Sequence, residues 1–87
     1  MREQYSNVLR SFFHRKLRRR RTELGISQEE MASRLAMASR SYADLDQGKT
    51  GCSGLTLALF LIYICADPLE FLEELQAALE SSDQHAA

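Results

Sequence analysis

The sequence predicts an all-α domain of five helices. Apolar residues recur every three or four positions along most of the chain, which is the spacing of a helix that buries one face. Serine, aspartate and glycine stand where such segments begin and end, as helix capping requires. The 87 residues include one proline and four glycines, too few for the many turns of an all-β fold. A chain of this length forms one domain with a thin core, which we assign to residues 1–80.

The first predicted helix begins between Tyr5 and Ser11 and ends at Gly25, because glycine readily adopts the left-handed conformation that stops a helix. A run of four arginines at residues 18–21 has to wrap around this helix. We expect the stem of Arg20 to lie along the edge of the core with its charged head in water. The buried stripe of this helix comprises Val8, Leu9, Phe12, Phe13, Leu17 and Leu24.

Residues 27–48 are predicted to form two short helices joined by a tight turn, the pattern called a helix-turn-helix. Ser27 stands where it can cap the first of these helices, and Glu30 completes a capping box three residues later. Ile26 and Met31 flank this start as a hydrophobic staple. The sequence therefore marks the start of the first of these two short helices unusually fully.

The turn between the two helices is predicted at residues 36–38, and the second helix at about residues 39–47. Tyr42 and Leu45 stand three positions apart, so both point toward the core. Gly48 ends the second helix. The other side chains of this helix are then expected to project outward.

Residues 55–66 are almost entirely apolar, and we expect them to form a helix that is buried on all sides. The segment is far shorter than the ~20 residues that cross a bilayer, so no membrane helix is predicted. Asp67 is expected to cap the last helix, and Pro68 occupies its first position. Residues 81–87 are small and polar, and we expect a flexible tail there.

The formal net charge of −1 conceals an uneven distribution of charge along the chain. Residues 1–24 carry eight basic side chains against two glutamates, whereas the chain from Asp67 onward carries six acidic side chains and no Lys or Arg. This asymmetry favours a basic face that meets a polyanion and an acidic face directed away from it.

No residue pattern indicates enzyme chemistry or a bound cofactor. His14 and His85 have no partners at metal-ligand spacing and are expected to be surface residues. Cys52 and Cys65 are too few for a disulfide framework and indicate reduced thiols in a cytoplasmic protein. No nucleophile, base and acid combine into a catalytic set, so we expect no enzyme activity, no cofactor and no metal.

These features together resemble the phage repressor and Cro family of helix-turn-helix regulators, also called the XRE family, over about residues 9–72. The resemblance rests on Leu17 to Arg21 before Gly25, Ile26 to Ala32, Leu35, Tyr42, Leu45 and Asp46, Gly48 to Thr50, and an apolar helix that leads into Asp67 and Pro68. It implies five helices, of which the second lies across the DNA backbone and the third enters the major groove.

The resemblance also implies a set of DNA-binding residues. The base-reading side chains would be Ser39, Arg40, Ser41 and Asp44. The phosphate-binding groups would be Gln28, Gln47, Lys49 and Thr50. A structural ion pair would join Arg21 to Asp46.

Four positions depart from the family pattern. Asp46 is one methylene shorter than the usual glutamate, and Asp44 places a negative charge where a groove-facing side chain is expected. Ala36 stands in the turn where the family usually has glycine, which implies strain or an altered turn. Ala38 replaces the usual cap of the recognition helix, so Ser39 either caps that helix or faces DNA. Arg40 either contacts guanine or touches only phosphate and water. Asp44 either accepts from a cytosine amino group or pairs with Arg40 one turn away.

We therefore expect a bacterial or phage transcriptional regulator that binds double-stranded DNA sequence-specifically, with repression favoured over activation. Apolar residues in excess of what a small core buries lie in the fourth and fifth predicted helices, and they indicate a homodimer through those helices. A two-fold dimer would place two recognition helices one DNA turn apart, ~34–36 Å. The alternative, from another class, is a protein-interaction module, antitoxin-like or an adaptor, that uses the same fold without reading DNA.

Overall fold

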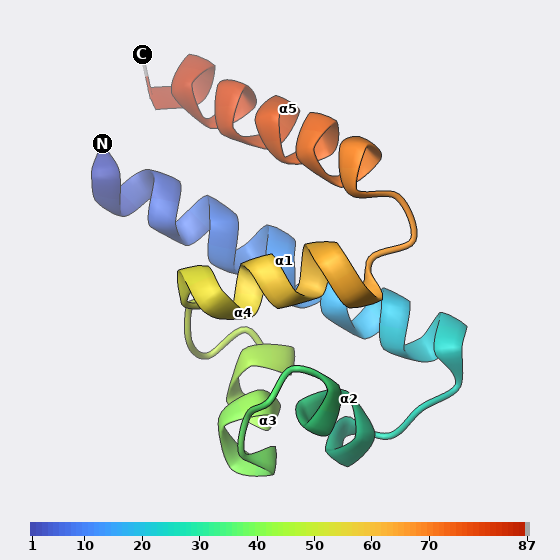
Figure 1. Ribbon diagram of the computed structural model, residues 1–87. Coiled ribbons are helices and arrows are strands. Elements are labelled where there is room, and N and C mark those ends of the chain that lie inside the picture. The colour runs from blue at the N-terminus through green and yellow to red at the C-terminus, as the bar shows by residue number, and fades with distance from the viewer. Residues whose placement is uncertain (87) are drawn as a thin grey trace.

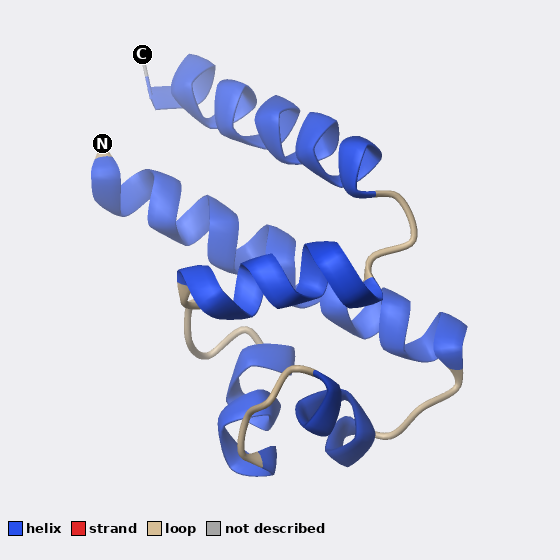
Figure 2. Cartoon of the chain, viewed as in Figure 1, coloured by secondary structure: helices blue, strands red, loops and turns tan. Residues whose placement is uncertain are grey.

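Helices form all the regular structure in residues 1–86, the part of the backbone that the computed structural model describes; side chains are described for residues 1–82. The elements are α1 (Arg2–Leu24), α2 (Gln28–Arg34), α3 (Ser39–Asp46), α4 (Gly54–Leu59), the π-helical segment η1 (Phe60–Ile64) and α5 (Pro68–Ala86) (Figures 1 and 2). Because η1 continues α4 without a break, the chain forms five helical rods. The predicted all-α fold of five helices is therefore confirmed.

Helix α1 is the longest element, and the other helices are arranged around it (Figure 1). Helix α5 packs along α1 and runs in the opposite direction, so the two ends of the chain lie at the same end of the molecule. The α2–α3 pair lies on the other side of α1 from α5, and α3 contacts α1 directly. The helix-turn-helix and the acidic last helix are thus on opposite sides of the molecule.

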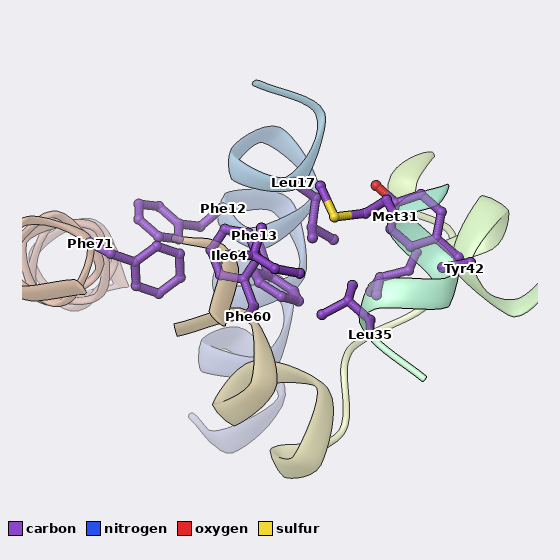
Figure 3. Packing of buried hydrophobic residues seen from close by; sticks show 11 residues of the cluster. Phe12, Phe13, Leu17, Met31, Leu35, Tyr42, Phe60, Ile64 and Phe71 are labelled. Atoms are coloured by element: carbon purple, nitrogen blue, oxygen red, sulfur yellow. The ribbon is translucent and has the colours of Figure 1, made fainter. Parts of the chain in front are cut away.

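The core is one continuous cluster that reaches from α5 to the helix-turn-helix (Figure 3). On the α5 side lies an aromatic cluster of Phe12, Phe13, Phe60 and Phe71. Its ring centres are 5.1 Å apart for Phe12 and Phe71 and 5.2 Å apart for Phe13 and Phe60, both edge to face. Pairs with this geometry add about 0.5–1.5 kcal/mol each beyond their burial. The cluster therefore fixes α5 and the α4–η1 rod against the N-terminal half of α1.

Both ends of the chain are more helical than the sequence indicates. Helix α1 begins at Arg2, upstream of the predicted start, and α5 continues to Ala86, although a flexible tail was expected over residues 81–87. The side-chain amide of Gln4 donates to the backbone carbonyl of Ser82 at 2.8 Å and to its hydroxyl at 2.6 Å. Each terminal helix extends further because the other provides its last turns with a partner. The final residue lies outside the described part of the chain.

The prediction that residues 55–66 form a helix buried on all sides is wrong. Leu55, Ile62 and Tyr63 are 69%, 69% and 74% exposed. A domain of this size has too little interior to enclose a whole helix, so the α4–η1 rod buries only one side, with Phe60 at its centre. Among the described helices, none has the length and hydropathy needed to cross a bilayer.

The α4–η1 rod leaves α-helical geometry at its C-terminal end. The Cys65 N–H donates to the Phe60 carbonyl at 2.8 Å, a bond between residues five apart. The Arg20 side chain donates through Nε to the Ile64 carbonyl at 2.7 Å. The expectation that the head of Arg20 lies in water is therefore wrong, because the end of a helix leaves carbonyl groups without partners and Arg20 satisfies one of them.

Candidate DNA interface

Helix α2 begins with the serine cap that the sequence predicts. The Ser27 hydroxyl accepts from the Glu30 N–H at 3.1 Å, and Ser27 itself has extended backbone geometry. The Glu30 carboxylate accepts from Arg34 Nε at 3.1 Å, one turn further along, rather than from the Ser27 N–H, so only the serine half of the predicted capping box forms. Met31 is fully buried beneath this first turn. The start of α2 is therefore fixed both by its cap and by its inward-facing methionine.

The turn between α2 and α3 depends on a left-handed alanine. Ala36 has φ 55°, close to the φ values of 67° and 76° at Gly25 and Gly48, which end α1 and α3. Across the turn the Met37 N–H donates to the Ala32 carbonyl at 2.9 Å, the bond that also closes glycine-terminated helices. The sequence predicted either strain at Ala36 or an altered turn. The turn keeps its usual shape, and Ala36 is strained by about 1 kcal/mol relative to glycine.

Helix α3 is held by a buried inner face and has an exposed outer face. Tyr42 and Leu45 are buried, as predicted. The exposed positions on α3 and just after it are Ser39, Arg40, Ser41, Gln47, Lys49 and Thr50, and Asp44 is partly exposed. Seven of the eight residues assigned to DNA contacts therefore lie along one helix and the turn that follows it, and Gln28 lies partly buried at the start of α2.

The structure excludes one of the two interpretations left open for Ser39 and one of the two left open for Asp44. The N-cap position is Ala38, which has no side-chain bond, and Ser39 is already the first helical residue. Ser39 does not cap the helix, because its backbone is helical rather than extended. Arg40 and Asp44 form no ion pair with each other or with any other residue among those whose side chains are described. The hydroxyl of Ser39 and both charges are thus available to a ligand.

A buried carboxylate ties α3 to α1 and α2. Asp46 is 2% exposed. Its Oδ2 accepts from Arg21 Nε at 3.1 Å and from the Tyr42 hydroxyl at 2.8 Å, and its Oδ1 accepts from Gln28 Nε2 at 3.4 Å. Arg18 Nε lies 3.6 Å from Oδ1. These five side chains form the Asp46 network, which links three helices through one acid.

The Asp46 network changes the acidity of its members. The bond to Asp46 raises the pKa of the Arg21 guanidinium above its ordinary value, so this arginine stays charged. Burial raises the pKa of the Tyr42 hydroxyl, and the bond that this hydroxyl donates to Asp46 raises it further. Tyr42 therefore stays protonated and acts as a donor. The sequence identified Tyr42 only as a core residue, because a hydroxyl partner four residues away cannot be read from apolar spacing.

The arginine run on α1 is mostly neutralised within the chain. Arg18 and Arg21 pair with Asp46, and Glu23 lies 3.7 Å from Arg19 and 3.6 Å from Arg20. Each of the four arginines at residues 18–21 therefore has a carboxylate partner. In the part of the chain with described side chains, Arg40 and Lys49 have none, and both are exposed beside the outer face of α3.

His14 is not the surface residue that the sequence suggested. Its imidazole lies between α1 and the end of α3, where it packs on the backbone of Gly48. Nothing in the sequence marked this contact, since it depends on α1 crossing α3 at that position. The side chain of His85 lies outside the described residues. Within the described residues, no group of three or more His, Cys, Asp and Glu side chains could hold a metal ion.

Comparisons of this chain with protein-family models, with curated proteins and with solved structures find no match. The features of the chain that bear on function are the exposed face of α3, the unpaired Arg40 and Lys49, and the network that holds this helix in place.

Proposed function

We propose that this chain is a sequence-specific, double-stranded DNA-binding transcriptional regulator that acts as a cytoplasmic repressor, with α3 in the major groove. The observation that carries the proposal is the exposed outer face of α3, from Ser39 to Asp44, with the unpaired Lys49 at its end. The major groove admits one α-helix, and a helix-turn-helix inserts the N-terminal residues of its second helix there.

Arg40 is the residue that discriminates most strongly between bases. Its guanidinium donates two hydrogen bonds to O6 and N7 of a guanine, worth about 1–3 kcal/mol of discrimination. Asp44 lies one turn further along α3 and accepts from a cytosine amino group. Ser39 and Ser41 flank Arg40 and donate to either base or phosphate. The absence of an Arg40–Asp44 ion pair within the described residues supports separate contacts for the two charges.

The turn after α3 and the start of α2 hold the DNA backbone. Gln47, Lys49 and Thr50 are exposed on that turn and bind phosphate oxygens. Gln28 reaches phosphate by exchanging its bond to Asp46, which at 3.4 Å is a long hydrogen bond and is weak. These contacts orient the protein on the duplex and carry no base information.

The distribution of charge supports the same orientation. Helix α5 carries Glu70, Glu73, Glu74 and Glu80 and lies on the opposite side of the molecule from α3 (Figure 1). Docking α3 into DNA therefore keeps the acidic helix away from the phosphates. Electrostatic repulsion from the net negative charge of the chain is reduced in this orientation.

The homodimer through α4 and α5 remains part of the proposal. Five large apolar side chains on the α4–η1 rod and α5 are at least 46% exposed: Leu55, Ile62, Tyr63, Leu69 and Leu72. A second copy that covers them would form a two-fold assembly with two α3 helices facing successive major grooves. Light scattering at tens of micromolar protein, with and without duplex DNA, tests this assembly. A monomeric mass in both conditions would rule it out.

The direct test of the function uses fluorescence anisotropy with a random duplex at low salt and with duplexes selected from a random pool. We expect Arg40→Ala to reduce the preference for selected over random duplexes. Lys49→Ala should weaken all duplexes alike and lower the salt slope by about 1. Arg2→Ala, an exposed arginine at the far end of α1, removes the same charge and should change neither quantity.

The same experiment distinguishes the regulator from a second candidate, a protein-interaction module on the same fold. The exposed apolar side chains of α4 and α5 favour that module, because leftover apolar surface marks partner sites. A chain that binds no duplex even at low salt, where non-specific binding is strongest, would be such a module. Binding of random duplex that depends on Lys49 supports the regulator.

A further inference from the structure

His14 supports the turn that follows α3. Gly48 occupies the left-handed conformation with φ 76°. A Cβ atom at this position would lie 3.0 Å from Cδ2, 3.1 Å from Cγ and 3.3 Å from Nε2 of His14, all of which are tighter than an ordinary van der Waals contact. The imidazole therefore packs against Gly48, and glycine suits this position both by its left-handed φ and because a Cβ atom would press on the ring.

The supported turn carries three of the residues that we assign to phosphate binding. The Gly48 N–H donates to the Leu45 carbonyl at 3.1 Å, and the Lys49 N–H donates to the Asp44 carbonyl at 2.9 Å. These two bonds close the end of α3 and set the direction in which the chain leaves it. A ring packed behind Gly48 limits how far this turn can tilt away from α3.

The contact between His14 and the turn is one of shape rather than of hydrogen bonding. Nδ1 of His14 is buried and has no hydrogen-bond partner among the described residues. The side chain lies at the interface of α1 and α3, which pack against each other. A planar ring is what this position requires, because a flat face covers the backbone of a glycine.

We propose that His14 is a positioning residue for DNA binding. It holds residues 47–50 in the orientation in which Lys49 and Thr50 meet the phosphate backbone, although it lies on α1 and touches no DNA itself. This inference rests on the proposed function. It requires that His14 affects binding to every duplex equally, because the residues that it positions do not read bases.

The first test is a double-mutant cycle measured by anisotropy with random duplex at low salt. We expect His14→Ala to raise the dissociation constant about fivefold, a typical coupling between contacting residues. In the Lys49→Ala background the same change should have a clearly smaller effect, because one of the contacts that His14 positions is already lost. In the Arg40→Ala background it should keep its full effect. Full effects in both backgrounds would overturn the proposal.

A second pair of variants separates positioning from loss of folding. His14→Phe keeps the planar ring and should retain most of the affinity that His14→Ala loses. Circular dichroism and thermal unfolding of both variants verify that each is folded under the assay conditions. If His14→Phe binds DNA as weakly as His14→Ala, the ring does not act through its shape and the proposal is wrong.

A third measurement does not depend on DNA. Hydrogen exchange of the Lys49 amide, which is bonded to Asp44, should be faster in His14→Ala than in the natural chain, relative to the Tyr42 amide. Unchanged exchange at Lys49 would overturn the positioning role while leaving the proposed function intact. Faster exchange in a chain that binds no duplex would support the contact and reject the DNA-binding function.

Discussion

The two halves of α1 hold their neighbours by different forces. The C-terminal half anchors α2 and α3 through the Asp46 network, where an ion pair and two neutral donors meet one carboxylate. The N-terminal half holds the α4–η1 rod and α5 mainly through the aromatic cluster, where packing has little directional preference beyond ring geometry. Hydrogen bonds from Gln4 to Ser82 add a polar contact near the ends of α1 and α5. Hydrogen bonds fix an orientation, whereas apolar packing fixes mainly a volume. The orientation of α3, the helix that we assign to DNA, is thus set by several polar contacts that converge on one acid.

The largest expected effect comes from the aromatic cluster. Phe60→Ala removes a ring that is 1% exposed and whose centre lies 5.2 Å from that of Phe13. We expect a loss of about 4 kcal/mol in the free energy of unfolding, as for other buried phenylalanines. Urea denaturation followed by circular dichroism measures it. Ile62→Ala, on the exposed side of the same rod, is the matched control and should cost less than about 0.5 kcal/mol.

The Asp46 network should contribute nearly as much. Asp46→Ala leaves Arg21 and the buried Tyr42 hydroxyl without their acceptor, and we expect a loss of about 3 kcal/mol. Asp44→Ala removes an acid from the same helix that has no ion pair among the described residues, so it should change stability little. Equal losses in the two variants would show that the polar network does not hold α3.

Ala36→Gly should stabilise the chain by about 1 kcal/mol, because it removes left-handed strain from the turn of the helix-turn-helix. Ala43→Gly, inside α3, is the control: the same substitution in a regular helix should destabilise the chain by a similar amount. Thermal midpoints measured by circular dichroism distinguish the two. A lower midpoint for Ala36→Gly would mean that the alanine side chain has a favourable contact that offsets its strain.

The smallest effect concerns the ion pair between Lys16 and Glu74, which joins α1 to α5. The hydrogen bond from Lys16 lowers the pKa of Glu74. A carboxylate with a lowered pKa in the folded state adds stability above its unfolded pKa, about 4.3 for Glu, and loses it as the pH falls through the folded value. We therefore expect the thermal midpoint of Glu74→Gln to lie below that of the natural chain at pH 7. The difference should shrink toward zero on acidification from about pH 5 to pH 3, and a constant difference would contradict this assignment.

Features with local causes could be predicted from the sequence. The cap at Ser27 depends on residues within one turn, and so does the bond from the Glu70 N–H to Asp67 at 3.1 Å. The helix stops at Gly25 and Gly48 were likewise predicted, because the left-handed conformation selects glycine regardless of tertiary context. The position and outward face of α3 follow from the same local signals.

Features that depend on distant partners could not be predicted. The ends of the two terminal helices are joined by the contact of Gln4 with Ser82, which no local pattern encodes. The exposure of Leu55 was missed because an apolar composition does not say how much interior a small domain offers. The role of His14 was missed for a related reason, since its contact with Gly48 exists only after α1 and α3 have packed together.

Helix α1 belongs to both packing regions, and this has a consequence for folding cooperativity. It comprises 23 residues, which at 1.5 Å per residue is about 35 Å of continuous helix. If α1 unfolds in one packing region, the other region loses part of its packing surface. The two regions should therefore unfold together as a single foldon. Differential scanning calorimetry should then record one heat-absorption peak whose van't Hoff enthalpy equals the calorimetric enthalpy. The shared helix makes this small domain an all-or-none unit.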